Sequence, residues 1–158
     1  MATLTIAGKQ LDVKFGFAFK NLADKNYGQK DKEGNDVGGF SSIYTGLLQF
    51  DIEALKAFWD CGLAHLGSKE RPKITEIEKG LEERIDEDGG TEELFKEAFR
   101  EIDSSGFFKK DAKMFWKNLE KFKNLGKTDE EKEENAMGAQ IMLEAKVELL
   151  DEEIELTA

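Results

Sequence analysis

Residues 4–28 read LTIAGKQLDVKFGFAFKNLADKNYG, and the spacing of apolar residues changes inside this stretch. Apolar and polar residues first alternate on both sides of a short turn, with the apolar ones at Leu4, Ile6, Leu11, Val13 and Phe15. This alternation predicts a β-hairpin. We place Gly8 and Lys9 at the centre of a type II′ turn, because glycine accepts the positive φ that this turn requires. Two strands are not stable alone, so the apolar face of the hairpin must pack on other elements.

Helical spacing of apolar residues follows the hairpin and continues along the rest of the chain. The first helix runs past Phe19 to a stop at Gly28, and a polar, glycine-rich loop fills 28–39. Further helices are expected over 40–48 and after the N-cap Asp51. A Thr75–Glu78 capping box begins another helix, which ends at about Asp86, and the next runs from Thr91 past Ile102. The last two run over Phe108, Ala112, Phe115, Leu119 and Phe122 to Gly126, and onward from a Thr128–Glu131 capping box. We therefore expect an α+β fold that is mostly α, with an N-terminal β-hairpin packed on five or six helices and an acidic amphipathic C-terminal helix.

Acidic residues concentrate at the C-terminal end. Residues 128–158 hold eleven Asp and Glu and two Lys, against 23 acidic and 21 basic residues in 1–127, within a net charge of −11. Apolar residues recur there at spacings of four, three and four, at Leu143, Val147, Leu150 and Ile154. This pattern predicts an acidic helix with a thin apolar seam. We divide the chain into a hairpin-plus-helices domain over 1–127 and an acidic helical segment over 128–158.

Composition narrows the classes of function. Twelve Phe and two Trp indicate an aromatic core, and the single cysteine, Cys61, excludes an intrachain disulfide and fits a reducing cytoplasm. We expect no signal peptide and no apolar run near the roughly 18 residues that span a bilayer, hence no membrane partner. The acidic tail repels phosphates, which argues against nucleic acid as a partner.

Three possible catalytic or metal sites do not hold up. Residues 93–116 resemble the start of an EF-hand, but calcium needs oxygen ligands where the loop has Phe107 and a bidentate Glu where it has Met114. Cys61 and His65 share a helix face, yet two ligands do not make a metal site and neither residue type occurs again. The acids at 82–88 point in different directions along a helix and suit a solvated surface. We therefore expect no catalytic residues, metal or cofactor.

One predicted helix is rich in lysine, at Lys109, Lys110, Lys113, Lys117, Lys121 and Lys123. Aromatic residues between these lysines are compatible with stacking on nucleic acid, but they keep the spacing of a buried face. We favour a solvated face for the lysines. As a second explanation, the acidic C-terminal segment folds back weakly onto 109–123.

The order of segments resembles a known protein family. A hairpin of the form LTIAGKQLDVKF is followed by GFAFKNLADKNYG, a glycine-rich loop, GGFSSIYTGLLQFDIEALKAFWDCGLAHL, PKITEIEKGLEERID and ELFKEAFREIDSSGFFKK. Over residues 3–120 this is similar to the tail assembly chaperones of long-tailed (siphovirus-type) bacteriophages that infect Gram-positive bacteria. The segment after Lys127 lies outside the resemblance.

The resemblance implies a non-enzymatic protein of the infected host cell's cytoplasm that is absent from the mature virion. Such chaperones bind the long helical tape measure protein, keep it soluble and help to recruit tail tube subunits. Tube recruitment is associated with a longer, frameshifted form, and this chain would be the short form. We also expect self-association.

Partner contacts are expected on exposed aromatic and seam residues. The candidates are Phe17, Phe19, Tyr44, Phe58 and Trp59 of the body and Leu143, Val147, Leu150 and Ile154 of the C-terminal helix. Each aromatic candidate equally fits a core position, and for Phe19 and Trp59 the core position is favoured. Two other functions remain open. One is a structural tail-completion or head–tail adaptor subunit incorporated into the virion, and the other is a small enzyme or metal protein built on Cys61 and His65.

Overall fold

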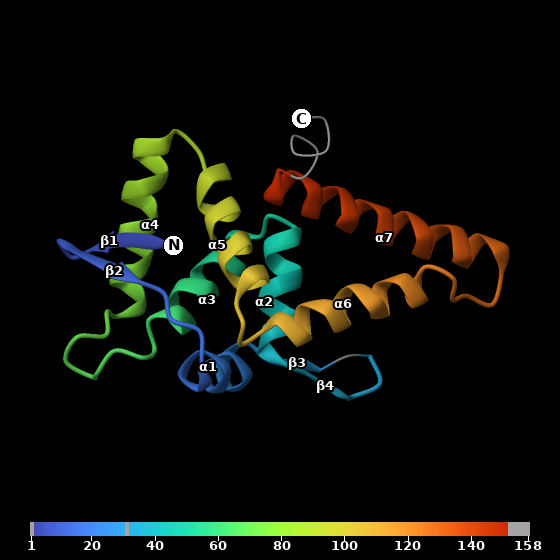
Figure 1. Ribbon diagram of the computed structural model, residues 1–158, viewed down its shortest axis with the longest axis horizontal. Coiled ribbons are helices and arrows are strands. Elements are labelled where there is room, and N and C mark those ends of the chain that lie inside the picture. The colour runs from blue at the N-terminus through green and yellow to red at the C-terminus, as the bar shows by residue number, and fades with distance from the viewer. Residues whose placement is uncertain (1, 31, 152–158) are drawn as a thin grey trace.

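The N-terminal hairpin packs against a helix, as its apolar face requires (Figure 1). The computed structural model describes residues 2–30 and 32–151. Strand β1 (Thr3–Ile6) pairs antiparallel with β2 (Lys9–Asp12), and β1 lies on α4 (Ile74–Asp88). Leu4 and Ile6 are buried there, and a side chain at Gly80 of α4 would meet the Thr5 carbonyl oxygen at 2.9 Å. Glycine at position 80 thus allows the strand to approach the helix.

The turn of this hairpin lies one residue earlier than predicted. Ile6 pairs with Lys9, so Ala7 and Gly8 form the turn, with φ of 50° and 79°. Positive φ at both central residues defines a type I′ turn rather than the expected type II′. Leu4 pairs with Leu11 in this register, which places apolar side chains of both strands on the face that meets α4.

Three helices form the centre of the fold. Helices α1 (Phe17–Tyr27), α2 (Gly39–Leu48) and α3 (Ile52–Gly62) all pack on one another. Asp51 caps α3 as predicted, since its side chain accepts a hydrogen bond from the Glu53 amide at 3.0 Å. The segment predicted as a loop contains a second short hairpin, β3 (Gln29–Lys30) and β4 (Asp36–Val37), between α1 and α2.

Helices α4 and α5 (Glu92–Ser104) follow as an antiparallel pair, with α4 against the hairpin and α5 against α2, α3 and α7 (Figure 1). Helix α4 starts earlier than the predicted Thr75–Glu78 capping box. Lys73 is the N-cap, and its amide donates to Glu76 Oε1 at 2.9 Å. Glu78 instead accepts a hydrogen bond from Lys56 of α3 at 3.2 Å. The Glu78 carboxylate, which the sequence pattern assigned to the capping box, therefore binds α3 instead.

The last two helices form an antiparallel arm that extends from the body (Figure 1). Helix α6 (Lys109–Phe122) leads through a short loop to α7 (Asp129–Leu150). Thr128 caps α7 as predicted, accepting from the Glu131 amide at 3.1 Å. Helix α7 packs on α5, α6 and α2, and its Leu149 is fully buried in the core.

The buried face of α7 differs from the predicted seam. The buried residues are Ala139, Ala145 and Leu149, whereas Leu143, Val147 and Leu150 are only half-buried. Ile154 lies outside the described residues. The difference arises because α7 meets α2, α5 and α6 of its own chain, and the residues that face these helices are buried whether or not they belong to the seam.

An aromatic core connects these elements and confirms the predicted α+β, mostly α fold. Phe15, Phe19, Phe58 and Phe108 contact one another with ring centroids 5.3 to 6.2 Å apart. Phe40 stacks on Phe108 and joins this group to Tyr44 of α2. The described residues form the N-terminal hairpin, six body helices and the acidic helix α7, in the predicted order.

Candidate partner-binding surface

Most of the aromatic residues named as contact candidates are core residues. Phe19, Tyr44 and Phe58 have no exposed surface, and Trp59 is 1% exposed. Their positions follow from helical spacing, because each lies on the side of α1, α2 or α3 that faces the neighbouring helices. A partner cannot reach these four side chains in this conformation.

Phe17 is the aromatic candidate that does reach the surface. It begins α1, is 71% exposed, and packs edge-to-face on Phe107 with ring centroids 5.3 Å apart. Phe107 is 37% exposed and lies just before Phe108, the buried N-cap of α6. The two rings therefore form a small exposed aromatic cluster where α1 meets the start of α6.

Further apolar side chains are exposed on α6 and in the loop that follows it. Met114 is 39%, Phe122 44% and Leu125 59% exposed. Met114 and Phe122 border a groove of about 420 Å³ between α2 and α6, which is also lined by Phe40, Ser41, Asp111, Phe115, Asn118 and Leu119. Phe122 had been predicted to continue the buried stripe of this helix, and its exposure corrects that expectation.

A buried polar network holds α6 on the body. The Tyr44 hydroxyl donates to Asp103 Oδ1 of α5 at 2.6 Å and accepts from Trp116 Nε1 of α6 at 2.6 Å. Burial, followed by the hydrogen bond to Asp103, raises the pKa of Tyr44 well above its usual range, so the hydroxyl stays protonated. Three helices thus meet at one hydroxyl, which fixes the orientation of the exposed face of α6.

The C-terminal helix makes its ionic contacts with α5. Asp151 pairs with Lys96 at 3.4 Å and with Arg100. On the α6 side, the Lys146 ammonium lies 4.8 Å from the centroid of the Trp116 ring. The acidic segment therefore folds back onto α6 as predicted, but not through the predicted charges, because its ion pairs among the described residues are with α5 and none is with a lysine of 109–123.

The half-buried seam residues of α7 border a second groove. Leu143 and Val147 line a hollow of about 460 Å³, together with Lys96, Gln140, Glu144, Glu148 and Asp151. Leu150 packs against the core instead. Met137 and Ile141 are the large apolar side chains of α7 that are most exposed, at 67% and 61%. Partner binding by the seam residues stays a prediction.

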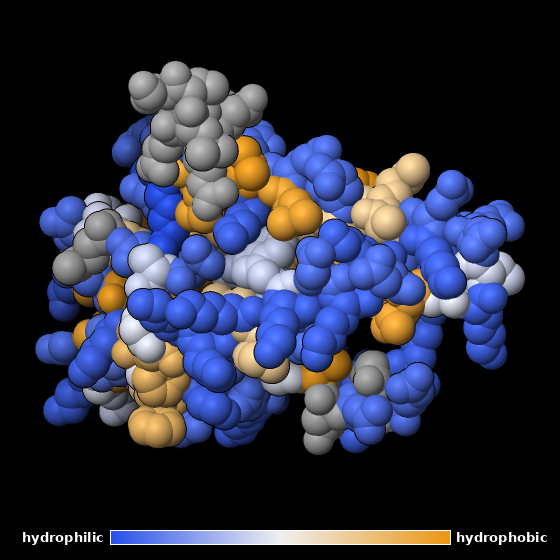
Figure 2. All heavy atoms as spheres, turned by 45° about the vertical axis from the view of Figure 1, so that its right-hand side comes forward, coloured by the Kyte–Doolittle hydropathy of each residue, from blue (hydrophilic) through white to orange (hydrophobic). Residues whose placement is uncertain are grey.

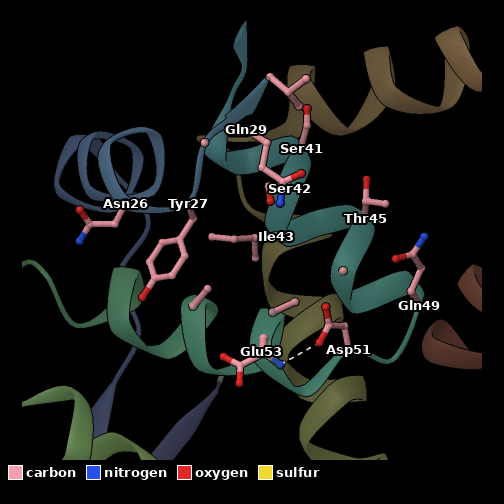
Figure 3. A pocket seen from close by; sticks show the side chains of 15 residues that line it. Asn26, Tyr27, Gln29, Ser41, Ser42, Ile43, Thr45, Gln49, Asp51 and Glu53 are labelled. Atoms are coloured by element: carbon pink, nitrogen blue, oxygen red, sulfur yellow. Dashed lines mark hydrogen bonds between the residues drawn. The ribbon is translucent and has the colours of Figure 1, made fainter. Parts of the chain in front are cut away.

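A polar hollow of about 480 Å³ lies between α1, α2 and the start of α3 (Figure 3). The acids that line it have local roles: Asp51 caps α3, and Glu53 pairs with Lys56 at 2.8 Å. Tyr27 points toward α3, where its hydroxyl donates to the buried Asp60 at 2.8 Å. These contacts orient the helices, and they assign no chemical step to the hollow.

Cys61 and His65 do not form a reactive pair in the structure. Cys61 is fully buried, and burial raises the pKa of its thiol, which disfavours the nucleophilic thiolate. His65 Nε2 lies 3.2 Å from the Asp12 carbonyl oxygen, so the imidazole ties the end of α3 to β2. No cluster of three or more possible metal ligands occurs within 2–30 and 32–151.

The face that carries α6 and α7 is mostly hydrophilic, with hydrophobic patches between the charged side chains (Figure 2). Sequence analysis missed Phe107, Met114 and Leu125 as surface residues. Met114 and Phe122 lie eight residues, about two turns, apart on α6. Phe108, Phe115 and Phe122 recur at seven, so the spacing alone does not distinguish exposed from buried positions. Among the described helices, none is long and apolar enough to cross a membrane.

A family model provides the comparison with known proteins. The model described as "Phage tail assembly chaperone protein, TAC" matches residues 3–117, from the N-terminal hairpin into α6. No curated protein and no solved structure shows a significant match.

Proposed function

The chain belongs to the phage tail assembly chaperone family, and from this premise we propose that it binds the tape measure protein of its phage, keeps it soluble and helps to recruit tail tube subunits. The family match supports a chaperone role in tail assembly. The partner and the recruitment step are the proposed parts.

The observation that carries this proposal is the row of exposed apolar side chains on a rigidly held helix. Met114 and Phe122 are more than a third exposed, while Trp116 of the same helix is anchored to Tyr44. Apolar surface presented this way is typical of a site that binds another protein. A long helical protein that has not yet been enclosed by its tube exposes matching apolar surface and aggregates without a cover.

The remaining features follow from this role. We propose that the protein is non-enzymatic, acts in the host cytoplasm, is absent from the finished virion and associates with further copies of itself along the tape measure protein. The acidic residues of 128–158 would keep such complexes apart by repulsion. A siphovirus-type phage of a Gram-positive host remains the expected source.

Expression of the tape measure protein with and without this chain tests the proposal. We expect the tape measure protein in the soluble fraction only when the chain is present. Mass spectrometry of purified virions is the second arm. Finding this chain there in amounts comparable to tail proteins would favour the structural tail-completion or head–tail adaptor subunit instead.

A further inference from the structure

The groove between α2 and α6 carries a more specific inference. Its floor is apolar, formed by Phe40, Phe115 and Leu119, and its edge is formed by the exposed Met114 and Phe122. On α6 the groove is lined from Asp111 to Phe122, eleven positions apart, which is about 17 Å at 1.5 Å per residue. This length suits one helix of about three turns lying along α6.

The charge beside the groove determines which kind of partner helix fits it. Residues 109–123 hold six lysines and two acidic residues, in a chain with a net charge of −11. Three lysines flank the exposed stripe on its outer side, because their distances from Met114 along the chain are helical spacings. Lys110 lies four residues before Met114, and Lys117 and Lys121 lie three and seven residues after it. All three are exposed, and none forms an ion pair within the part of the chain that the structure describes.

The acidic residues of the same helix do not cancel this charge. Glu120 pairs with Lys123 at 2.6 Å and lines the small hollow toward α7, on another side of α6. Asp111 lies in the groove near the start of α6. A local positive rim therefore borders an apolar groove on an otherwise acidic protein.

We propose that this groove binds an amphipathic helix of a partner protein whose apolar face is flanked by acidic residues. The apolar face covers Met114, Phe122 and the floor of the groove, and the flanking carboxylates lie beside Lys110, Lys117 and Lys121. Only the identity of that partner, a segment of the tape measure protein, rests on the proposed function.

Binding of the purified 158-residue chain to overlapping peptides of about 30 residues that cover the tape measure protein tests the proposal, because such peptides exceed the roughly 11 residues that three helical turns need. We expect Met114→Asp with Phe122→Asp to weaken the best-bound peptide at least about tenfold. Lys110→Glu, Lys117→Glu and Lys121→Glu together should weaken it and remove most of its salt dependence.

Matched controls separate the groove from general surface effects. Met137→Asp with Ile141→Asp adds the same charge at exposed apolar positions of α7, and Lys9→Glu, Lys69→Glu and Lys79→Glu reverse three exposed charges elsewhere. Both controls should bind like the wild type. Thermal unfolding of every variant shows whether it is folded, and the lysine variants still test the groove if the aspartate pair is unstable.

The outcomes distinguish the two proposals. If neither the whole tape measure protein nor any peptide binds the wild-type chain, the proposed function is wrong. The groove then has no binding partner in the tape measure protein either. If the wild type binds but the folded groove variants bind as well as the controls, the groove proposal alone is wrong. A best-bound peptide that lacks acidic residues beside its apolar face would also overturn it.

Discussion

The indole N–H of Trp116 donates a hydrogen bond to the Tyr44 hydroxyl oxygen across 2.6 Å, joining α6 to α2. The residues are 72 positions apart in the chain, and the same hydroxyl donates to Asp103 of α5. This contact determines how α6 presents its exposed face, because the neighbouring Met114 and Phe122 depend on the orientation of that helix.

Tyr44→Phe removes both hydrogen bonds and leaves the Trp116 indole and the Asp103 carboxylate without this partner. We expect the free energy of unfolding to fall by about 1–3 kcal/mol, the usual cost of leaving such groups unsatisfied. Urea denaturation measures it. A double-mutant cycle with Trp116→Phe should show non-additive losses. Additive losses would mean that the two side chains do not act together.

Docking of α7 is tested by Leu149→Ala. Leu149 is fully buried, so this change should cost about 2–5 kcal/mol, as for other leucines removed from a core. The matched control is Ile141→Ala, which shortens a similar aliphatic side chain on the exposed side of the same helix. Ile141 is 61% exposed, so this change should alter the free energy of unfolding by less than about 0.5 kcal/mol. Equal effects at both positions would show that α7 does not pack as described.

The division of the chain at residue 127 leads to a deletion experiment. We propose that 1–127 folds without 128–158, because the aromatic cluster of Phe15, Phe19, Phe58 and Phe108 lies entirely within it. Deletion should leave the circular dichroism of the remaining helices but speed amide exchange along 109–123, where Lys146 no longer covers Trp116. Unchanged amide exchange along 109–123 would argue against docking of the C-terminal segment on α6. An unfolded 1–127 fragment would argue against dividing the chain at residue 127.

His65 gives the protein a specific pH dependence. Burial, and then the nearby charge of Lys14, lower the pKa of the His65 imidazole below 6.5. The unfolded chain therefore binds this proton first, so stability is present above pH 6.5 and is lost as the pH falls below it. His65→Gln, at the only histidine of the chain, should remove this contribution, so that the variant loses less stability than the wild type as the pH falls below 6.5. An unchanged slope would contradict this assignment.

Local patterns predicted much of the fold. The stripe of Leu94, Phe95, Ala98, Phe99 and Ile102 is buried as expected, and the Asp51 cap is correct. Errors arose where another part of the chain decides the outcome. Glu78 bonds to Lys56 instead of capping its own helix, and strand register moved the first turn to Ala7 and Gly8.

The candidate surface was harder to predict than the fold. An aromatic residue at helical spacing fits either the core or a contact, and the packing of neighbouring helices made Phe58 a core residue and left Phe17 at the surface. Phe122 is the last residue of α6 and lines the groove between α2 and α6 instead of the core, and so it is exposed. Such outcomes depend on tertiary contacts that spacing does not encode.

The central claim is most directly tested by co-expressing this chain with the tape measure protein of the same phage and measuring the product by size-exclusion chromatography with light scattering. The proposed function predicts one soluble complex whose mass corresponds to many copies of the chain on each tape measure protein. A tape measure protein that remains insoluble while this chain elutes by itself would contradict it.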